Sequence, residues 1–352
     1  MKRVFLDGLG RLPVVRDVEV PEITDEEVLI KVKVASICNL TDVHTIEGTH
    51  PPHHVWAEGY LRTPAHAWPA PLGHESAGEV VKVGKYAARE FAPGDRVCTI
   101  HASETMSEYV KARPEWLAKL PDSVSYEEAS PIELLSWVNI LVEDTVRPGT
   151  VVAILGQGSS GLMATQCAKV AGARRIIVSD PVREKRELAL KLGADIALDP
   201  TSQDIVKEIE RLTDGKGVDT VVECAGIPDT IRICTQLVRK REPHLGGTRP
   251  GTIAVFGACW DPVPFDFFEL HFKGAHVVTA GATTLGYTKA GLQRGVDLVA
   301  SGQIKMRPLL THKFYIDDVA EAFKLLMEKR EPAVKVLIVP DKEYFDHVRL
   351  GD

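Results

Sequence analysis

The stretch GQGSSG at residues 156–161 constrains the fold most, because of the segments on either side of it. It follows the apolar run 151–155 and opens a helical pattern from Leu162 to Ala171, and a second apolar run then ends at Asp180. A strand, a glycine turn, a helix and a second strand that ends in an acid are typical of a dinucleotide-binding βαβ unit. The sequence therefore predicts that this part of the chain binds a dinucleotide.

Each glycine of the motif has a separate physical task in such a unit. Gly156 permits the tight turn, Gly158 lets the backbone approach a pyrophosphate, and Gly161 lets the helix pack closely against the strand. The helix N-terminus adds partial positive charge and free N–H groups. Asp180 would accept hydrogen bonds from the adenosine ribose hydroxyls and repel a 2′-phosphate, which favours NAD over NADP. Arg183 lies nearby, but its basic neighbours indicate a solvated helix face instead.

The apolar pattern changes near residue 150. Earlier in the chain apolar and polar residues alternate, as in the segment 28–34 with its two lysines, which predicts an antiparallel sheet or barrel with one wet face. Later, continuous apolar strands alternate with helical patterns, which predicts a parallel sheet covered on both faces. We expect strands at 151–155, 176–178, 220–223, 252–256 and 276–280, and helices that include 184–192 and 205–212. A helix over 319–329 and a strand over 334–339 follow, and pattern alone assigns them to neither domain.

Composition narrows the class of protein. The chain has 352 residues, enough for two domains, and its hydrophobic (44%) and charged (26%) contents are typical of soluble globular proteins. The net charge is −7 with acids and bases interspersed, so we expect no nucleic-acid partner. We expect no membrane span and no signal peptide, because no apolar run is long enough and the start is charged. Six scattered cysteines indicate reduced thiols and a cytoplasmic location.

A second set of polar residues precedes the glycine turn. Cys38 ends an apolar strand, His74 and Glu75 precede another, and Glu133 interrupts an apolar stretch. A thiolate, an imidazole and a carboxylate from separate loops make a three-ligand zinc site with an open fourth position. Taken singly, each residue has an ordinary structural explanation. Cys38 could be a small buried hydrophobe, His74 a turn histidine, and Glu133 a residue on a wet helix face.

Longer motifs carry a family resemblance. The segment PLGHESAGEVVKVG at 71–84, followed by PGDRV at 93–97, resembles the signature of zinc-dependent medium-chain alcohol dehydrogenases, in their sorbitol-, polyol- and threonine-dehydrogenase branch. The similarity covers essentially the whole chain. It implies an α/β protein with a GroES-like, mostly antiparallel β catalytic domain and a Rossmann domain with a doubly wound parallel sheet. The implied bounds are 1–135 for the catalytic domain, 136–284 for the Rossmann domain, and 285–352 for a segment that returns to the catalytic domain.

The resemblance also implies roles around the metal. Cys38 and His74 match zinc ligands, and Glu133 matches the third ligand in its carboxylate form. Glu75 matches the acid behind the zinc, which binds the metal directly in some relatives. Asp42 would orient His74 from outside the ligand shell.

A proton relay is implied next to the metal ligands. Thr41 matches the hydroxyl that takes the alcohol proton, and His44 matches the outer end of the relay, since histidine titrates near neutrality. His44 could instead be an ordinary surface histidine. His101 falls where relatives place a side chain that faces the substrate, which favours a polar secondary alcohol.

Three features depart from the family pattern. The segment 38–42 reads CNLTD, one residue longer than the common spacing next to Thr41. A histidine-rich segment, 50–66, is additional, and it could cover a pocket or form a plain surface loop. The lobe that carries four cysteines and a structural zinc is missing, which leaves Cys98 without partners. We therefore expect one catalytic zinc and no structural zinc.

Together these features predict an NAD- and zinc-dependent oxidoreductase that acts on a small alcohol or ketone, and a homodimer or homotetramer. Two other functions stay open, a zinc-free quinone or enoyl reductase of the same superfamily and a non-catalytic NAD-binding sensor. The expected cofactor-binding residues are Gly156, Gly158, Ser160, Gly161, Leu162, Asp180 and Lys335.

Overall fold

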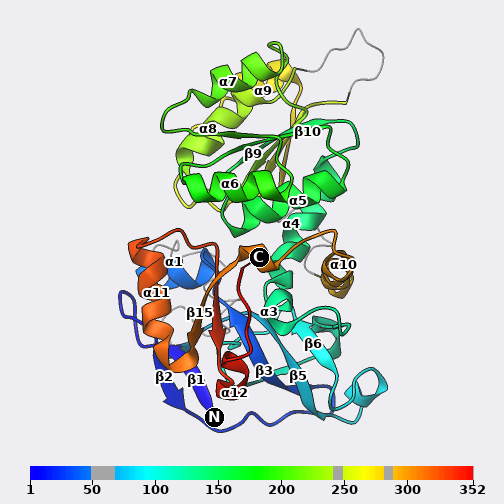
Figure 1. Ribbon diagram of the computed structural model, residues 1–352, viewed down its shortest axis with the longest axis vertical. Coiled ribbons are helices and arrows are strands. Elements are labelled where there is room, and N and C mark those ends of the chain that lie inside the picture. Colours follow the sequence, from blue (N-terminus) through cyan, green and yellow to red (C-terminus); the bar gives the residue numbers. More distant parts are fainter. Residues whose placement is uncertain (49–67, 241–248, 281–287, 352) are drawn as a thin grey trace. The chain divides into compact units, whose positions relative to one another are not determined.

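The computed structural model describes residues 1–48, 68–240, 249–280 and 288–351 (Figure 1). The histidine-rich segment 50–66 lies outside these ranges. Contacts divide the chain into two compact units. The first comprises Met1–Ser136, Tyr287–Gly302 and Met306–Asp352, and the second comprises Trp137–Gly286 and Gln303–Lys305. These divisions fall after residues 136 and 286, where the sequence predicts them after 135 and 284.

A seven-stranded sheet forms the centre of the first unit, with the strand order β15-β16-β3-β5-β6-β8 and β7 paired to β3. All of its pairings are antiparallel except the one between β15 and β16. The strands are β3 (Val28–Ser36), β5 (Glu75–Val83), β6 (Arg96–Thr99), β7 (Tyr109–Ala112), β8 (Leu117–Lys119), β15 (Leu310–Tyr315) and β16 (Lys335–Val339). Strands from both ends of the chain therefore share one sheet.

The alternation predicted for residues 28–34 is present in β3. Ile30, Val32 and Val34 are fully buried, whereas Lys31 and Lys33 are partly exposed. The buried side chains join the main core of the unit, which also includes residues of β16 and α11. The predicted mostly antiparallel sheet is confirmed.

Helices and a smaller sheet complete the first unit. The small sheet has the order β2-β1-β4. Its strands and the helices of the unit are β1 (Lys2–Leu6), β2 (Val14–Asp17), β4 (Ala70–Pro71), α1 (Thr41–Glu47), α3 (Tyr126–Ala129), α10 (Lys289–Ala300), α11 (Val319–Glu328) and α12 (Lys342–Phe345). Helix α4 (Ile132–Thr145) begins in this unit and ends in the second one.

The second unit contains a six-stranded, fully parallel sheet with the order β11-β10-β9-β12-β13-β14. Its strands are β9 (Val151–Leu155), β10 (Arg175–Ser179), β11 (Ile196–Leu198), β12 (Thr220–Glu223), β13 (Thr252–Val255) and β14 (His276–Thr279). The helices are α5 (Ser159–Val170), α6 (Arg183–Leu192), α7 (Ile205–Leu212), α8 (Pro228–Leu237) and α9 (Phe267–Lys273), and Figure 1 shows them around the sheet. This is the predicted doubly wound arrangement, and the α/β fold class is confirmed.

One strand of this sheet is missing from the sequence prediction. β11 (Ile196–Leu198) is a short apolar run of three residues between polar residues, and two of the three are partly exposed. Tertiary pairing with β10 makes it a strand.

The glycine turn has the geometry that its sequence predicts. Gly156 has a φ of +86°, and a Cβ atom there would lie 2.9 Å from Ala225. A Cβ on Gly161 would lie 1.9 Å from the carbonyl oxygen of Gly156, so only glycine allows this helix to pack so closely. In contrast, a Cβ on Gly158 would meet nothing within 4 Å. No protein atom requires glycine at position 158, which is consistent with the open approach predicted for a ligand.

Candidate active site

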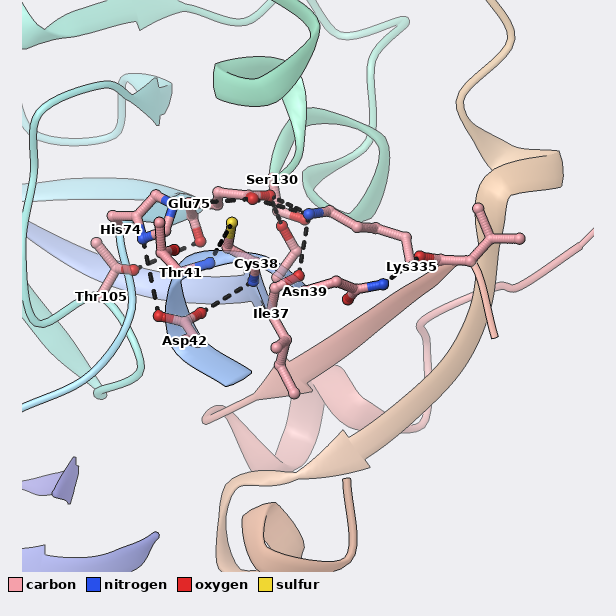
Figure 2. Close-up of polar contacts among 12 residues, drawn as sticks. Ile37, Cys38, Asn39, Thr41, Asp42, His74, Glu75, Thr105, Ser130 and Lys335 are labelled. Atoms are coloured by element: carbon pink, nitrogen blue, oxygen red, sulfur yellow. Dashed lines mark hydrogen bonds and ion pairs between the residues drawn. The ribbon is translucent and has the colours of Figure 1, made fainter. Parts of the chain in front are cut away.

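Three potential metal ligands meet inside the first unit. The ligand atoms of Cys38, His74 and Glu75 all lie within 4.8 Å of one another (Figure 2). The pairing of β3 with β5 explains this proximity, because Ser36 at the end of β3 is the register partner of Glu75 at the start of β5. Cys38 therefore follows β3 at the same edge of the sheet where His74 precedes β5.

Asp42 links two of these residues. One of its carboxylate oxygens accepts a hydrogen bond of 2.9 Å from the backbone N–H of Cys38. The other lies 3.8 Å from Nδ1 of His74. The aspartate is 5% exposed, so its charge acts on the site with little screening by water.

The site is rich in negative charge. Burial disfavours the imidazolium form of His74, but its hydrogen bond to Cys38 and the charge of Cys38 outweigh this and raise its pKa to about 10. The charges of Asp42 and Glu133 act in the same direction. Burial also raises the pKa of Asp42 itself. Thiolate, imidazole and carboxylate are the donor types that zinc prefers, and a buried group of anions is stabilised by a cation. The residues present therefore fit a zinc ion.

Glu133 lies in the first turn of α4 and is 4% exposed. It does not belong to the group of ligand atoms within 4.8 Å, but its charge reaches both His74 and Lys335. The structure thus brings both candidate carboxylates, Glu75 and Glu133, to the same buried site. A wet helix face is excluded for Glu133 by its burial.

Lys335 has a different environment from the one that its sequence position suggests. The sequence predicts a cofactor-binding residue, whereas the ammonium lies 2.8 and 2.7 Å from the two carboxylate oxygens of Glu75 (Figure 2). It also donates a hydrogen bond of 3.0 Å to the carbonyl oxygen of Ile37. Burial opposes its charged form, yet the charge of Glu75 raises the pKa of Lys335. Ser36, whose hydroxyl donates to Glu75, is a further site residue that the sequence prediction omits.

A signal for this interaction does exist in the sequence. Lys335 is a charged residue at the start of an apolar strand, and β16 is buried along its whole length. A lysine in such a strand requires an anionic partner. The sequence does not identify that partner, because Glu75 is 260 residues away.

Helix α1 carries the two residues of the predicted relay. Thr41 and His44 are three positions apart and so lie on the same side of the helix. The backbone N–H of Thr41 donates to the sulfur of Cys38 over 3.5 Å, which connects the helix start to the metal ligands. Nδ1 of His44 lies 3.5 Å from Oε2 of Glu47, and its side chain is 31% exposed.

His101, the predicted substrate residue, follows β6 with a strained backbone. Its φ is +56°, a left-handed conformation that non-glycine residues rarely adopt. Its ring lies 6.3 Å from that of Trp116 at an angle of 54°. Such strain concentrates at functional sites.

In the second unit, Asp180 is a structural support of the glycine turn. One carboxylate oxygen accepts a hydrogen bond of 2.7 Å from the N–H of Gln157, and the other accepts one of 2.8 Å from the N–H of Val182. A carboxylate can accept about four hydrogen bonds, so capacity for a ribose hydroxyl remains. Arg183 is 79% exposed at its side chain and pairs with Glu187 over 2.8 Å, as predicted for a solvated helix face.

Two family profiles match the chain. The alcohol dehydrogenase GroES-like domain matches residues 24–122, and the zinc-binding dehydrogenase domain matches residues 161–300. Among curated relatives, sorbitol dehydrogenase of Bacillus subtilis is 29% identical, over 92% of this chain and 93% of its own length. L-threonine 3-dehydrogenase of Pyrococcus horikoshii is 31% identical, over 88% of this chain and 90% of its own length.

Solved structures agree with these relatives. The 2R,3R-butanediol dehydrogenase of Bacillus subtilis superposes with a TM-score of 0.80 at 26% identity, covering 97% of this chain and 99% of its own. A Sinorhizobium meliloti protein described as a zinc-binding dehydrogenase and bound to NADP also superposes with a TM-score of 0.80, at 27% identity, covering 96% of this chain and 99% of its own. With the fold, the ligand group and both profiles in agreement, the chain is an oxidoreductase that belongs to the zinc-dependent medium-chain alcohol dehydrogenase family.

Proposed function

We propose that this protein uses one zinc ion and NAD to oxidise a small, polar secondary alcohol to a ketone, or to catalyse the reverse reaction. The observation that carries this proposal is the group of Cys38, His74 and Glu75, whose ligand atoms lie within 4.8 Å of one another in a negatively charged environment, with His74 and Glu75 buried. A zinc-free reductase or a sensor that only binds NAD would have no use for this group.

Cys38 and His74 would hold the ion together with a carboxylate. Lewis acidity, which eases loss of an alcohol proton, is the chemistry that zinc supplies, while the nicotinamide accepts the hydride. Asp42 keeps His74 and the backbone of Cys38 in place. No nucleophilic side chain is required.

The chain's own residues would manage the proton. We assign the first acceptor to the hydroxyl of Thr41, at the start of α1, and the outer position to His44, one helical turn further on. The partial exposure of His44 suits a group that exchanges protons with solvent.

NAD is favoured by the charges around the second strand of the parallel sheet. Asp180 would oppose a 2′-phosphate. Two basic residues lie nearby, but Arg183 is paired with Glu187 and Arg186 with Asp199. The Sinorhizobium meliloti protein binds NADP, so the preference of this chain for NAD over NADP has to be measured.

The substrate class is supported by the relatives. Sorbitol, L-threonine and 2R,3R-butanediol, which are named for three of them, are all small polar molecules with a secondary hydroxyl. The environment of a carboxylate-bound metal and the polar ring of His101 agree with such a substrate. Polyols, cyclitols and amino alcohols all belong to this class.

We also propose a homodimer, formed through an edge of the parallel sheet. β14 is an edge strand among the described residues, and Val277 in it is 43% exposed. Just before it, α9 exposes Phe267 and Phe268 at 74% and 76%. A second copy related by a two-fold axis would pair β14 with its own counterpart and cover these rings.

A cytoplasmic location is supported by the cysteines, because all six are free thiols. No helix among the described residues is long and apolar enough to cross a membrane.

Metal analysis tests the site directly. We expect one zinc per chain and no structural zinc. Cys98 is fully buried, and burial raises the pKa of its thiol to about 12, which disfavours the thiolate that a second zinc would need. Cys38→Ser should abolish zinc retention. It should lower turnover by more than roughly a hundredfold, the upper end of the effect of losing a residue that only hydrogen-bonds a metal ligand. Cys98→Ala is the matched control and should keep its zinc. Two tightly held zinc ions in the wild type would contradict the proposal.

Cofactor preference tests Asp180. We expect kcat/KM to favour NAD over NADP by about a hundredfold, the effect of roughly 3 kcal/mol of lost hydrogen bonding and repulsion. Asp180→Ala should narrow this gap, because it removes the negative charge together with both acceptor oxygens. Arg183→Ala should leave the preference unchanged. Equal efficiency with both cofactors in the wild type would remove the role assigned to Asp180.

A substrate panel with NAD tests the reaction. Polyols, cyclitols and L-threonine should be oxidised with a higher kcat/KM than ethanol or a long-chain primary alcohol. Glu133→Gln should weaken metal retention and reduce the rate, and His101→Ala should reduce the advantage of polar substrates. If simple primary alcohols were the best substrates, the assigned substrate class would be wrong.

Light scattering tests the dimer. The wild type should have twice the mass of one chain, and Phe268→Glu should give monomers because it places a charge in the interface. Leu190→Glu is the matched control, since Leu190 is also exposed (44%) but lies on α6. A monomeric wild type would refute the interface.

A further inference from the structure

The connection between β6 and β7 begins beside the proposed metal site. β6 pairs with β5 in antiparallel register, and this register continues to Ser76 and Thr99, whose hydroxyl oxygens lie 3.0 Å apart. Two residues further along each segment, the same register leads to His74 on one side and His101 on the other. The connection therefore leaves β6 at the end of the sheet where His74 precedes β5.

The far end of this connection packs against the loop that carries the ligand histidine. The backbone N–H of Thr105 donates a hydrogen bond of 3.2 Å to the carbonyl oxygen of Gly73, and its hydroxyl donates to that of Glu75 over 3.5 Å (Figure 2). A Cβ atom on Gly73 would lie 2.7 Å from the backbone nitrogen of Met106, so the two backbones are in close contact. Residues 101–105, which we call the site loop, thus start and end beside the metal-binding loop.

Two residues of the site loop have left-handed backbone conformations. His101 has a φ of +56° and Glu104 a φ of +67°. Residues other than glycine keep this conformation only where the surrounding contacts enforce it. At the start of the loop, the N–H of Ile100 donates a hydrogen bond of 2.8 Å to the carbonyl oxygen of Trp116, and the rings of Trp116 and His101 lie 6.3 Å apart. These contacts hold the first of the two residues.

Glu104 is held through both its main chain and its side chain. Its carbonyl oxygen accepts a hydrogen bond of 2.7 Å from the hydroxyl of Ser107, which is fully buried. Its carboxylate lies 2.6 Å from the guanidinium of Arg3. The side chains of Arg3 and Glu104 are 14% and 36% exposed, so water weakens this ion pair less than it weakens a fully exposed pair.

Backbone pairing fixes the origin of the guanidinium. Strand β1 runs beside the residues that follow the site loop. The N–H of Val4 donates to the carbonyl oxygen of Met106 over 2.9 Å, and Arg3 is the bridge partner of Ser107. The reach of Arg3 towards Glu104 is therefore set by β1, a strand that belongs to neither the metal-binding loop nor the site loop.

We propose that Arg3 is a positioning residue for the substrate, because its ion pair with Glu104 holds the site loop in the conformation that places His101 beside the metal site. This inference rests on the proposed function, and it adds a determinant of alcohol binding that lies outside the metal ligands and the cofactor site. Arg3 acts through the backbone of the site loop and needs no contact with the substrate.

Hydrogen exchange and steady-state kinetics of the full-length, zinc-loaded protein test this role together. Both should be measured for the wild type, Arg3→Gln, Arg3→Lys, Glu104→Gly and the double variant Arg3→Gln/Glu104→Gly. Lys2→Gln is the matched control, because Lys2 lies on the same strand and its ion pair is with Asp317, far from the site loop in the sequence.

We expect Arg3→Gln to speed amide exchange in the site loop. It should raise KM for the best substrate of the alcohol panel by about tenfold, because a hydrogen bond between charged groups contributes enough free energy for a change of that size. KM for NAD and the zinc content should stay at the wild-type values. Arg3→Lys should remain close to the wild type, since it keeps the positive charge.

The glycine variant separates loop conformation from charge. Glycine adopts the left-handed conformation without an ion pair to enforce it. We therefore expect Glu104→Gly to keep a KM close to that of the wild type, and the double variant to lose most of the increase seen in Arg3→Gln. A role of the charge alone would leave the double variant as impaired as Arg3→Gln.

Several results would overturn the inference. An unchanged KM for the alcohol in Arg3→Gln would refute it, whatever the exchange rates show, and so would an equal increase in Lys2→Gln or a double variant without rescue. If Arg3→Gln does not fold, Glu104→Gln removes the same ion pair and is judged in the same way. The proposed function fails separately, if the wild type holds no zinc or oxidises no alcohol of the panel.

Discussion

Concentrated negative charge is the constraint on which the catalytic unit depends. Three buried carboxyl groups and a partly buried thiol surround His74, and such a group is stable only if cations compensate its charge. One compensating cation is the ammonium of Lys335, which belongs to the chain itself. The remaining negative charge would be compensated by the proposed metal ion. The pairing of β3 with β5 and β16 can be understood as the framework that holds these charges in register.

Sequence reasoning succeeded where physical signals are local. The continuous apolar strands, the glycine turn and the alternation in β3 all depend on neighbouring residues, and each is present in the structure. The sequence-based prediction was incomplete where the interacting residues or strands are far apart in the sequence. The short strand β11 depends on pairing with β10, and the ion pair of Lys335 with Glu75 joins residues that are 260 positions apart. Neither carries a periodic signal that would reveal its partner.

Asp180 shows how one residue can serve two requirements. Its position after β10 predicts contact with a ribose, yet its carboxylate is also what holds the N–H groups of Gln157 and Val182. The same acid would thus shape the glycine turn and select the cofactor. A substitution that removes this side chain therefore changes the order of the loop as well as its charge. The two effects cannot be separated by such a substitution.

The position of β16 in the sequence has a consequence for biosynthesis. Its five residues lie close to the C-terminus, yet they supply an inner strand of the sheet whose other strands are mostly made first. Until the segment that contains β16 has been synthesised, β3 lacks that neighbour and Glu75 lacks its counter-ion. Domains are usually completed in the order of synthesis, N-terminal first. Here the first unit is completed only once β16 has been synthesised, so β3 and β5 can pair before Lys335 reaches Glu75.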